Sequence, residues 1–177
     1  YCQGRGSIVV VCGSRGTGKT SMACAVLRKR IENGLALGGT YDRFQSLVAD
    51  FGVLFDGWHR VSSAQASGKF DKLAKTGALR VIDELKDPLD DAKGGPCARR
   101  LLTHLLDLRY ANGMDTILIT NHSMEALNSA QSPLGDSVLS RITERGGFIP
   151  CEWGSFRVPV PQIAPEDVGH LPGLKIS

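Results

Sequence analysis

A glycine-rich loop between an apolar run and a helical pattern is the feature that most constrains this chain. The stretch GSRGTGKTS, residues 13–21, fits the pattern G-x-x-x-x-G-K-[ST]. The β-branched run Ile8–Val11 precedes it and predicts a buried strand. The apolar residues that follow the loop recur at helical spacing: Met22, Ala23, Val26 and Leu27. Strand, glycine loop and helix therefore occur in the order that a phosphate-binding loop requires.

In such a loop, backbone N–H groups point at phosphate oxygens, and the N-terminus of the helix adds unpaired donors and partial positive charge. Lys19 is expected to reach the β- and γ-phosphates, and the Thr20 hydroxyl is expected to hold magnesium. The alternative is a glycine-rich turn that matches by chance, and the flanking strand and helix argue against it. The predicted nucleotide-binding residues are Gly13, Ser14, Arg15, Gly16, Thr17, Gly18, Lys19, Thr20 and Ser21.

The length predicts one domain over residues 1–177, with a proline-rich tail at 158–177. The charged and apolar fractions, 22% and 42%, are those of a soluble globular protein, and a net charge of +3 is too small to indicate nucleic-acid binding alone. No signal peptide or membrane-spanning run is present, so a cytoplasmic location is expected. The five cysteines have neither disulfide-framework nor zinc-site spacing: Cys2, Cys12, Cys24, Cys97 and Cys151.

The rest of the chain alternates predicted strands with predicted helices. Buried strands are expected at residues 79–85 and 116–121, a short helix within 61–78, and an amphipathic helix at 96–113. Residues 40–48 are ambiguous between strand and helix. The alternation predicts a parallel sheet covered by helices on both faces.

Polar residues end two of these strands. Ligands of open α/β sheets lie beyond the carboxyl ends of the strands. Asp83 is therefore expected to bind magnesium and Glu84 to polarise an attacking water, as in a Walker B element. Two solvated acids are the alternative, which the phosphate loop disfavours. Asn121 at the next strand end is able to orient water, although residue type alone favours a helix cap or turn role.

The order of five segments resembles the DnaC/IstB-like branch of AAA+ ATPases, which comprises replicative-helicase loaders and ATPase helpers of some transposons. The segments are the loop 13–21, VIDEL (81–85), LLDLRYANGMDTILITN (105–121), GDSVLSRI (135–142) and WGSFR (153–157). The resemblance implies a P-loop NTPase of AAA+ type, with a parallel five-stranded sheet sandwiched by helices and no full C-terminal lid domain. The tail agrees, because its prolines cannot build a helical lid: Pro159, Pro161, Pro165 and Pro172.

The same resemblance implies roles for three further residues. Asn121 corresponds to sensor 1, Arg141 to the arginine finger that reaches ATP on a neighbouring subunit, and Arg157 to a sensor-2-like arginine. Residue type alone favours a surface role for both arginines. A guanidinium forms bidentate hydrogen bonds with phosphate oxygens and stays charged, so the implied roles are chemically suitable. The expected catalytic set is Lys19, Glu84, Asn121, Arg141 and Arg157, with ATP and Mg²⁺ as cofactors.

The sequence also departs from the family. Lys86 follows Glu84-Leu85 where a glycine is usual, and Arg15 stands where many relatives carry proline. Few residues precede the first strand, whereas helicase loaders carry an N-terminal helicase-binding domain. Either this is a trimmed ATPase domain or the partner-binding part lies elsewhere.

An aromatic segment lies where the family inserts a helix that contacts single-stranded DNA. Trp58, Arg60 and Lys69 are the candidate DNA contacts, through base stacking and phosphate pairing. A core role is favoured for Phe51 and Phe55, and Trp58 is equally suited to core packing and to DNA contact. For Lys69, Lys72 and Lys75 a solvated helix face is the favoured interpretation.

The predicted function is ATP hydrolysis by a helicase-loader-type protein in DNA replication. A replicative helicase, single-stranded DNA and further copies of the chain, joined through ATP-bridged interfaces, are the expected partners; no membrane is involved. The alternatives are a transposition helper of IstB type and a nucleotide-gated interaction module with little turnover. Glu84 and Arg141 favour hydrolysis, because a pure switch needs neither.

Overall fold

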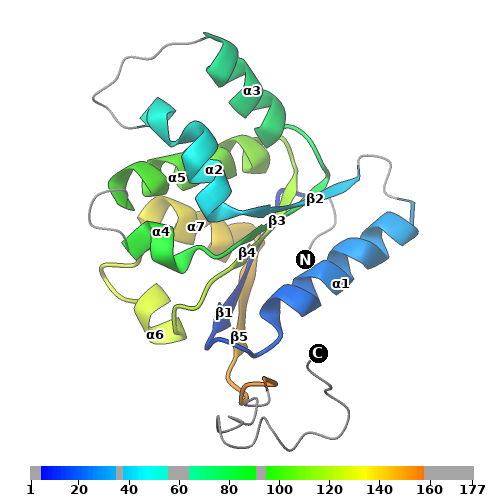
Figure 1. Ribbon diagram of the computed structural model, residues 1–177, viewed down its shortest axis with the longest axis vertical. Helices are drawn as coiled ribbons and strands as arrows, with labels where there is room; N and C mark the ends of the chain where they lie inside the picture. Colours follow the sequence, from blue (N-terminus) through cyan, green and yellow to red (C-terminus); the bar gives the residue numbers. More distant parts are fainter. Residues whose placement is uncertain (1–4, 35–37, 56–63, 91–94, 158–177) are drawn as a thin grey trace, which may run out of the picture.

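The structure is a computed structural model that describes residues 5–34, 38–55, 64–90 and 95–157 (Figure 1). Its centre is a five-stranded sheet in the order β2-β3-β4-β1-β5, in which every pair of neighbours is parallel. The predicted parallel five-stranded sheet is confirmed. The strands are β1 (Ile8–Gly13), β2 (Gly39–Arg43), β3 (Leu79–Asp83), β4 (Asp115–Ile119) and β5 (Gly147–Cys151).

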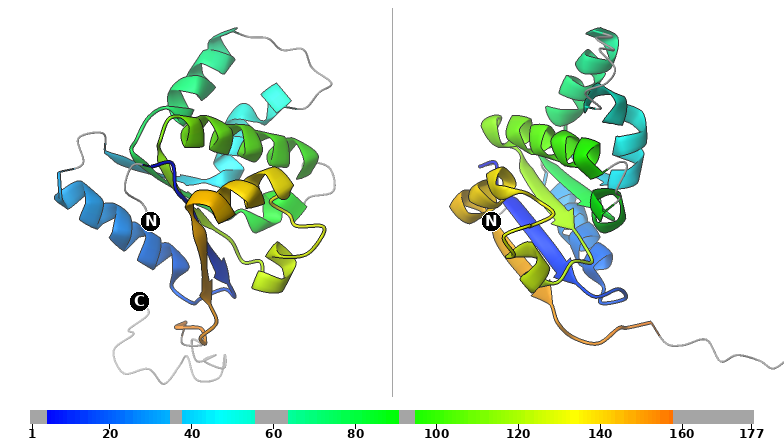
Figure 2. Two further views of the ribbon diagram at one scale, coloured as in Figure 1. Left: turned by 180° about the vertical axis from the view of Figure 1, so that it is seen from behind. Right: turned by 90° about the vertical axis from the view of Figure 1, so that its left-hand side faces the viewer.

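Helices cover both faces of this sheet, as Figures 1 and 2 show. Helix α1 (Lys19–Glu32) packs on one face, where Ala23 meets Val9 and Val11 of β1. The other helices lie on the side of the opposite face, where Val10 and Ile82 join the larger core. They are α2 (Phe44–Phe51), α3 (Ala64–Ala74), α4 (Lys86–Asp90), α5 (Gly95–Ala111), α6 (Met124–Leu127) and α7 (Asp136–Arg145). Burial on both faces explains the apolar runs Ile8–Cys12 of β1 and Ile117–Ile119 of β4.

The ambiguous stretch 40–48 contains both kinds of structure. Edge strand β2 is only partly buried, and α2 begins directly after it because Phe44 and Leu47 turn into the larger core. A short 3₁₀ turn (Gly52–Phe55) follows. Phe51 and Phe55 pack edge-on against Phe70, with ring centroids 5.4 and 5.3 Å apart, so the favoured core role is confirmed for both.

Strand β3 is two residues shorter than the run predicted at 79–85. It ends at Asp83 because Glu84 has a φ of 61°, in the left-handed region that extended strands do not use. Leu85 then turns inward and is fully buried. The early end places Glu84 just beyond the end of the strand.

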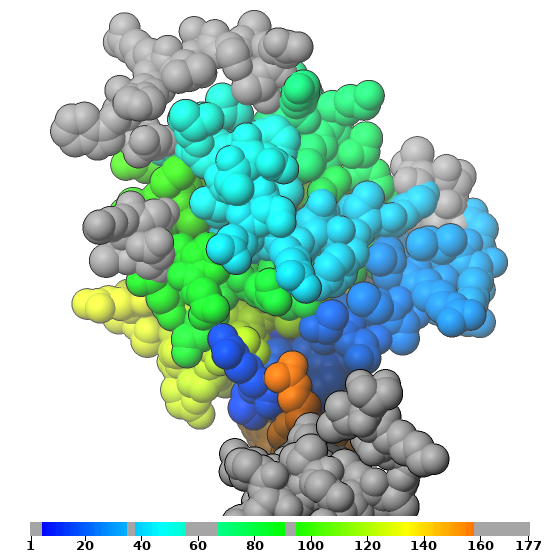
Figure 3. All heavy atoms as spheres, in the orientation of Figure 1, coloured from blue at the N-terminus to red at the C-terminus, as the bar shows by residue number. Residues whose placement is uncertain are grey.

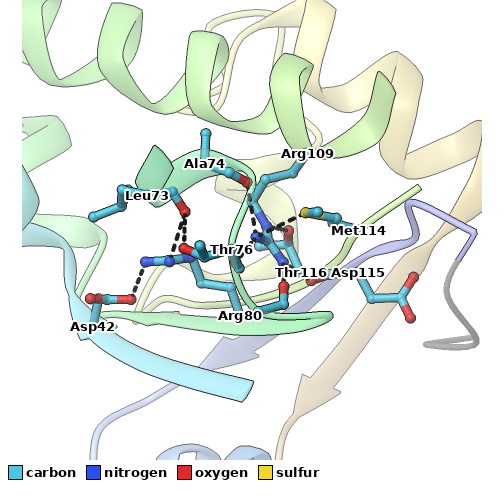
Figure 4. Close-up of polar contacts among 10 residues, drawn as sticks. Asp42, Leu73, Ala74, Thr76, Arg80, Arg109, Met114, Asp115 and Thr116 are labelled. Carbon is cyan, nitrogen blue, oxygen red and sulfur yellow. Dashed lines mark hydrogen bonds and ion pairs between the residues drawn. The ribbon is translucent and has the colours of Figure 1, made fainter. Parts of the chain in front are cut away.

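A buried arginine network fixes the opposite edge of the sheet, near the amino ends of β3 and β4 (Figure 4). Arg109 of α5 is wholly buried and donates to Thr116 Oγ1 at 2.9 Å and to the Asp115 carbonyl at 2.6 Å. Its remaining N–H groups meet the carbonyls of residues 74, 76 and 77 at 3.1–3.2 Å. Arg80 of β3 pairs with Asp42 of β2 at 2.5 Å. Burial and the neighbouring Arg80 lower the pKa of Arg109 to about 9, which leaves it charged at neutral pH.

Two predictions fall outside the described ranges. The proline-rich tail at 158–177, on which the expected lack of a full lid rests, is one, and the DNA contacts Trp58 and Arg60 are the other.

Within the described helices, none is long and apolar enough to cross a membrane.

Candidate nucleotide-binding and hydrolysis site

A cavity of about 810 Å³ opens at the carboxyl edge of the sheet. Residues 15–22 of the loop and first helix form one wall, and Asp83 at the end of β3 and Glu84 after it form another. Asn121 after β4 and Arg157 after β5 complete it. The fold therefore brings together the strand ends on which the predicted site residues lie, although these ends are far apart in the sequence.

The glycine loop has the conformation that a phosphate cradle needs. Gly16 and Gly18 have φ values of 85° and 80°, which glycine adopts without strain, and α1 begins at Lys19. Lys19 Nζ lies 2.8 Å from the Gly13 carbonyl and 2.6 Å from the Ser14 carbonyl. Burial lowers the pKa of this lysine. Its ammonium is thus held at the loop by carbonyls that phosphate oxygens are able to replace.

The predicted magnesium ligands meet at the mouth of the loop. Thr20 Oγ1 donates to Asp83 Oδ2 at 2.7 Å, and the Glu84 backbone N–H donates to Asp83 Oδ1 at 2.7 Å. Hydroxyl and carboxylate oxygens are the hard donors that Mg²⁺ prefers. Across the described ranges, no group of three or more His, Cys, Asp or Glu side chains is placed to hold a metal. Thr20 and Asp83 together offer only a few oxygen ligands. This suits magnesium, which usually takes its other ligands from phosphates and water.

The Glu84 carboxylate lies at the cavity in a half-exposed position. Its Oε2 is 3.7 Å from Nε of Arg43, the last residue of β2. Sequence reasoning missed Arg43, because only the pairing of β2 with β3 places it opposite Asp83. The pair holds the carboxylate loosely, since both groups are largely in water.

Asn121 does not cap the following helix. Ser123 does, accepting from the Ala126 N–H at 3.3 Å, so the alternative of an N-cap role for Asn121 is wrong. The backbone beside Asn121 is tied to the glycine loop by the bond from the Gly13 N–H to the His122 carbonyl, 3.1 Å long. Its side chain lines the cavity, as a sensor-1 role requires.

The segment after β5 contacts the glycine loop directly. Trp153 Nε1 donates to the Thr17 carbonyl at 2.9 Å, and the Phe156 N–H donates to the Gly16 carbonyl at 2.9 Å. Figure 3 shows the orange residues of this segment beside dark-blue residues from the start of the chain. Both aromatic side chains line the cavity next to Arg157. The motif WGSFR marked this segment, but its direct contact with the loop was not predicted.

Arg141 and Lys69 are not among the described residues that line the cavity. Arg141 lies on α7, where its Nη2 is 2.9 Å from Asp107 Oδ1 of α5 and its Nη1 donates to the Ser137 carbonyl at 2.7 Å. Lys69 is exposed on α3. The structure thus gathers the other predicted catalytic residues and leaves Arg141 apart from them.

Comparison with known proteins finds similarity to solved structures. No protein-family model matches the chain, and no curated protein sequence matches it either. Among solved structures, the DnaC helicase loader is 27% identical over 82% of this chain and 78% of its own, with a TM-score of 0.60.

More distant matches are replication initiators. Domain III of DnaA from Thermotoga maritima is 19% identical over 84% of this chain and 55% of its own, with a TM-score of 0.60. DnaA bound to AMPPCP and single-stranded DNA is 18% identical over 84% of this chain and 41% of its own, also with a TM-score of 0.60. The chain thus has an AAA+ P-loop fold and is related in structure to the DnaC helicase loader and to the DnaA initiators.

Proposed function

We propose that this chain binds and hydrolyses ATP with magnesium and acts in DNA replication in the cytoplasm as a helicase-loader-type ATPase. The observation that carries the proposal is one cavity in which Lys19, Thr20, Asp83 and Glu84 come together at the ends of β1 and β3. A phosphate loop without the acids at the end of β3 would support binding alone. The paired acids add groups for metal binding and for activation of water.

Each residue has a distinct part in the proposed reaction. Backbone N–H groups of the glycine loop hold the phosphates, and Lys19 exchanges the loop carbonyls for β- and γ-phosphate oxygens. Thr20 and Asp83 would hold Mg²⁺, whose charge would stabilise the negative charge that develops on the phosphates. Glu84 polarises the water that attacks the γ-phosphorus, so that ADP and inorganic phosphate leave. Asn121 orients this water, and Arg157 contacts the phosphates.

The proposal places Arg141 in the active site of a neighbouring subunit. Its position apart from its own cavity supports this, because a finger supplied in trans does not approach its own phosphate loop. Assembly of several copies is then required for full turnover. The domain of residues 1–177 is the proposed assembling unit.

A replicative helicase and single-stranded DNA are the proposed partners. Support comes from the 27% identity to the DnaC helicase loader and from the DnaA structure that holds AMPPCP and single-stranded DNA. Trp58, Arg60 and Lys69 remain the candidate DNA contacts.

The test combines an ATPase assay with a binding assay. We expect magnesium-dependent phosphate release that rises when single-stranded DNA is added, and retention of a replicative helicase by the immobilised protein when ATP is present. Retention of a transposase instead would indicate the transposition-helper alternative. ATP-dependent partner binding without phosphate release would indicate the interaction module and would refute the ATPase.

A further inference from the structure

The hydroxyl of Tyr41 makes a contact that the assigned roles do not use. It donates to Asp83 Oδ2 at 2.9 Å, on the same oxygen that accepts from Thr20 at 2.7 Å. The other carboxylate oxygen, Oδ1, accepts the Glu84 N–H at 2.7 Å. Both oxygens of the predicted metal ligand are therefore fixed, and Tyr41 supplies one of the bonds from a different strand.

The register of β2 on β3 brings Tyr41 to this place. Tyr41 pairs with Val81, and Arg43 pairs with Asp83, so the Tyr41 side chain emerges on the same face as Asp83 but two residues earlier. Two residues along a strand span about 6.6 Å, which the length of a tyrosine side chain covers and that of a serine or threonine does not. That face is the one covered by α1, from whose first turn Thr20 approaches.

We infer that Tyr41 is a positioning residue that holds the Asp83 carboxylate in the orientation needed to bind Mg²⁺–ATP. The inference rests on the proposed function. If the Thr20 hydroxyl bound the metal instead of Asp83, Oδ2 would lose one of its two side-chain donors. The Tyr41 bond would then keep the carboxylate from rotating. Partners of this kind orient metal-binding carboxylates and raise metal affinity.

Two properties of Tyr41 suit this role. A tyrosine phenol carries its proton at neutral pH, so it can serve as the donor to Asp83 Oδ2. Tyr41 lies on the edge strand, is 38% exposed, and belongs to neither apolar cluster of the core. Tyr41→Phe therefore removes the donor and leaves core packing intact.

The experiment measures binding of a fluorescent, non-hydrolysable ATP analogue at increasing Mg²⁺ concentration, and separately in EDTA. For Tyr41→Phe we expect the Mg²⁺ concentration at half-maximal effect to rise about tenfold. Affinity in EDTA should stay at the parent value, because the phosphate loop is unchanged. Tyr110→Phe is the matched control: its hydroxyl also bonds a carboxylate, that of Glu144, but it does not line this cavity, and it should alter neither value.

A double-mutant cycle tests the route through Asp83. In the Asp83→Asn background, Tyr41→Phe should cause no further rise in the Mg²⁺ requirement, because the group it positions is gone. An unchanged or lowered Mg²⁺ requirement in Tyr41→Phe would overturn the inference, and so would equal losses with and without the metal. An undiminished effect in the Asp83→Asn background would also overturn it.

Failure of the proposed function would look different. If the parent and Lys19→Ala bound the analogue equally, the nucleotide site itself would be wrong. If the parent bound the analogue with a clear Mg²⁺ dependence that Tyr41→Phe left unchanged, only the role of Tyr41 would be refuted.

Discussion

Thr20 and Asp83 are separated by 63 positions in the chain, yet Thr20 Oγ1 donates to Asp83 Oδ2 at 2.7 Å. This bond joins the first turn of α1 to the end of β3, so the glycine loop and the acidic strand end meet at one place. It also brings together the two side chains proposed to hold magnesium.

Removal of the loop ammonium should weaken nucleotide binding. Lys19→Ala deletes the cation that is held against the Gly13 and Ser14 carbonyls and is proposed to move to the phosphates. Hydrogen bonds to charged groups contribute roughly 1.5–3 kcal/mol, so the dissociation constant for ATP should rise about tenfold to a hundredfold. Calorimetric titration measures this. Lys29→Ala, an exposed lysine near the other end of α1, should bind ATP like the parent. Parent-like binding by Lys19→Ala would refute the phosphate cradle.

Glu84→Gln should separate binding from turnover. The amide is similar in size but cannot polarise water as a carboxylate does, so phosphate release should fall about 10²- to 10⁴-fold while Mg²⁺–ATP binding persists. A single-turnover assay together with a binding titration tests both halves. Glu125→Gln, an exposed acid in α6, serves as the control and should keep full activity. Normal turnover by Glu84→Gln would remove this residue from the reaction.

Arg141→Ala should retain ATP binding and lose turnover by about 10³-fold, as expected for a finger supplied in trans. Mixing it with Lys19→Ala should restore part of the activity, because one type of mixed interface joins an intact loop to an intact arginine. Arg141→Lys should rescue poorly, since a point charge does not reproduce the guanidinium fork. The specific activity of the parent should rise with protein concentration.

Arg145→Ala is the matched control for this assignment. Arg145 lies one turn further along α7, where its guanidinium stacks 4.5 Å from the Tyr110 ring centroid. It should keep turnover near the parent level. An inactive mixture, together with specific activity that does not depend on concentration, would return Arg141 to a structural role in its pair with Asp107.

The buried arginine network should dominate stability at the amino edge of the sheet. Arg109→Leu leaves several buried carbonyls without donors, each at a cost of about 1–3 kcal/mol, so the free energy of unfolding should fall by at least about 3 kcal/mol. Urea unfolding measures the change. Arg100→Leu, an exposed position on the same helix, should change stability by less than about 0.5 kcal/mol. Equal losses in the two variants would show that the network contributes little.

The sequence by itself determined the phosphate loop and its flanks. Strand β1, the loop and helix α1 are contiguous, so hydrophobic period, glycine spacing and order along the chain were enough to predict them. The acids at the end of β3 and Asn121 after β4 were predicted for a related reason. In a parallel sheet all carboxyl ends lie at one edge, so polar strand ends meet there whatever the strand order.

Only the tertiary structure decided the contacts that depend on which strands are neighbours and in what register. Residues 40–48 contain the end of a strand and the start of a helix. Residues up to Arg43 are extended because they pair with β3, whereas the following residues form α2, which buries Phe44 and Leu47 in the larger core. The same pairing placed Tyr41 on Asp83 and Arg43 beside Glu84. The register between two strands cannot be predicted from local sequence, because register is set by packing between segments that lie far apart in the chain.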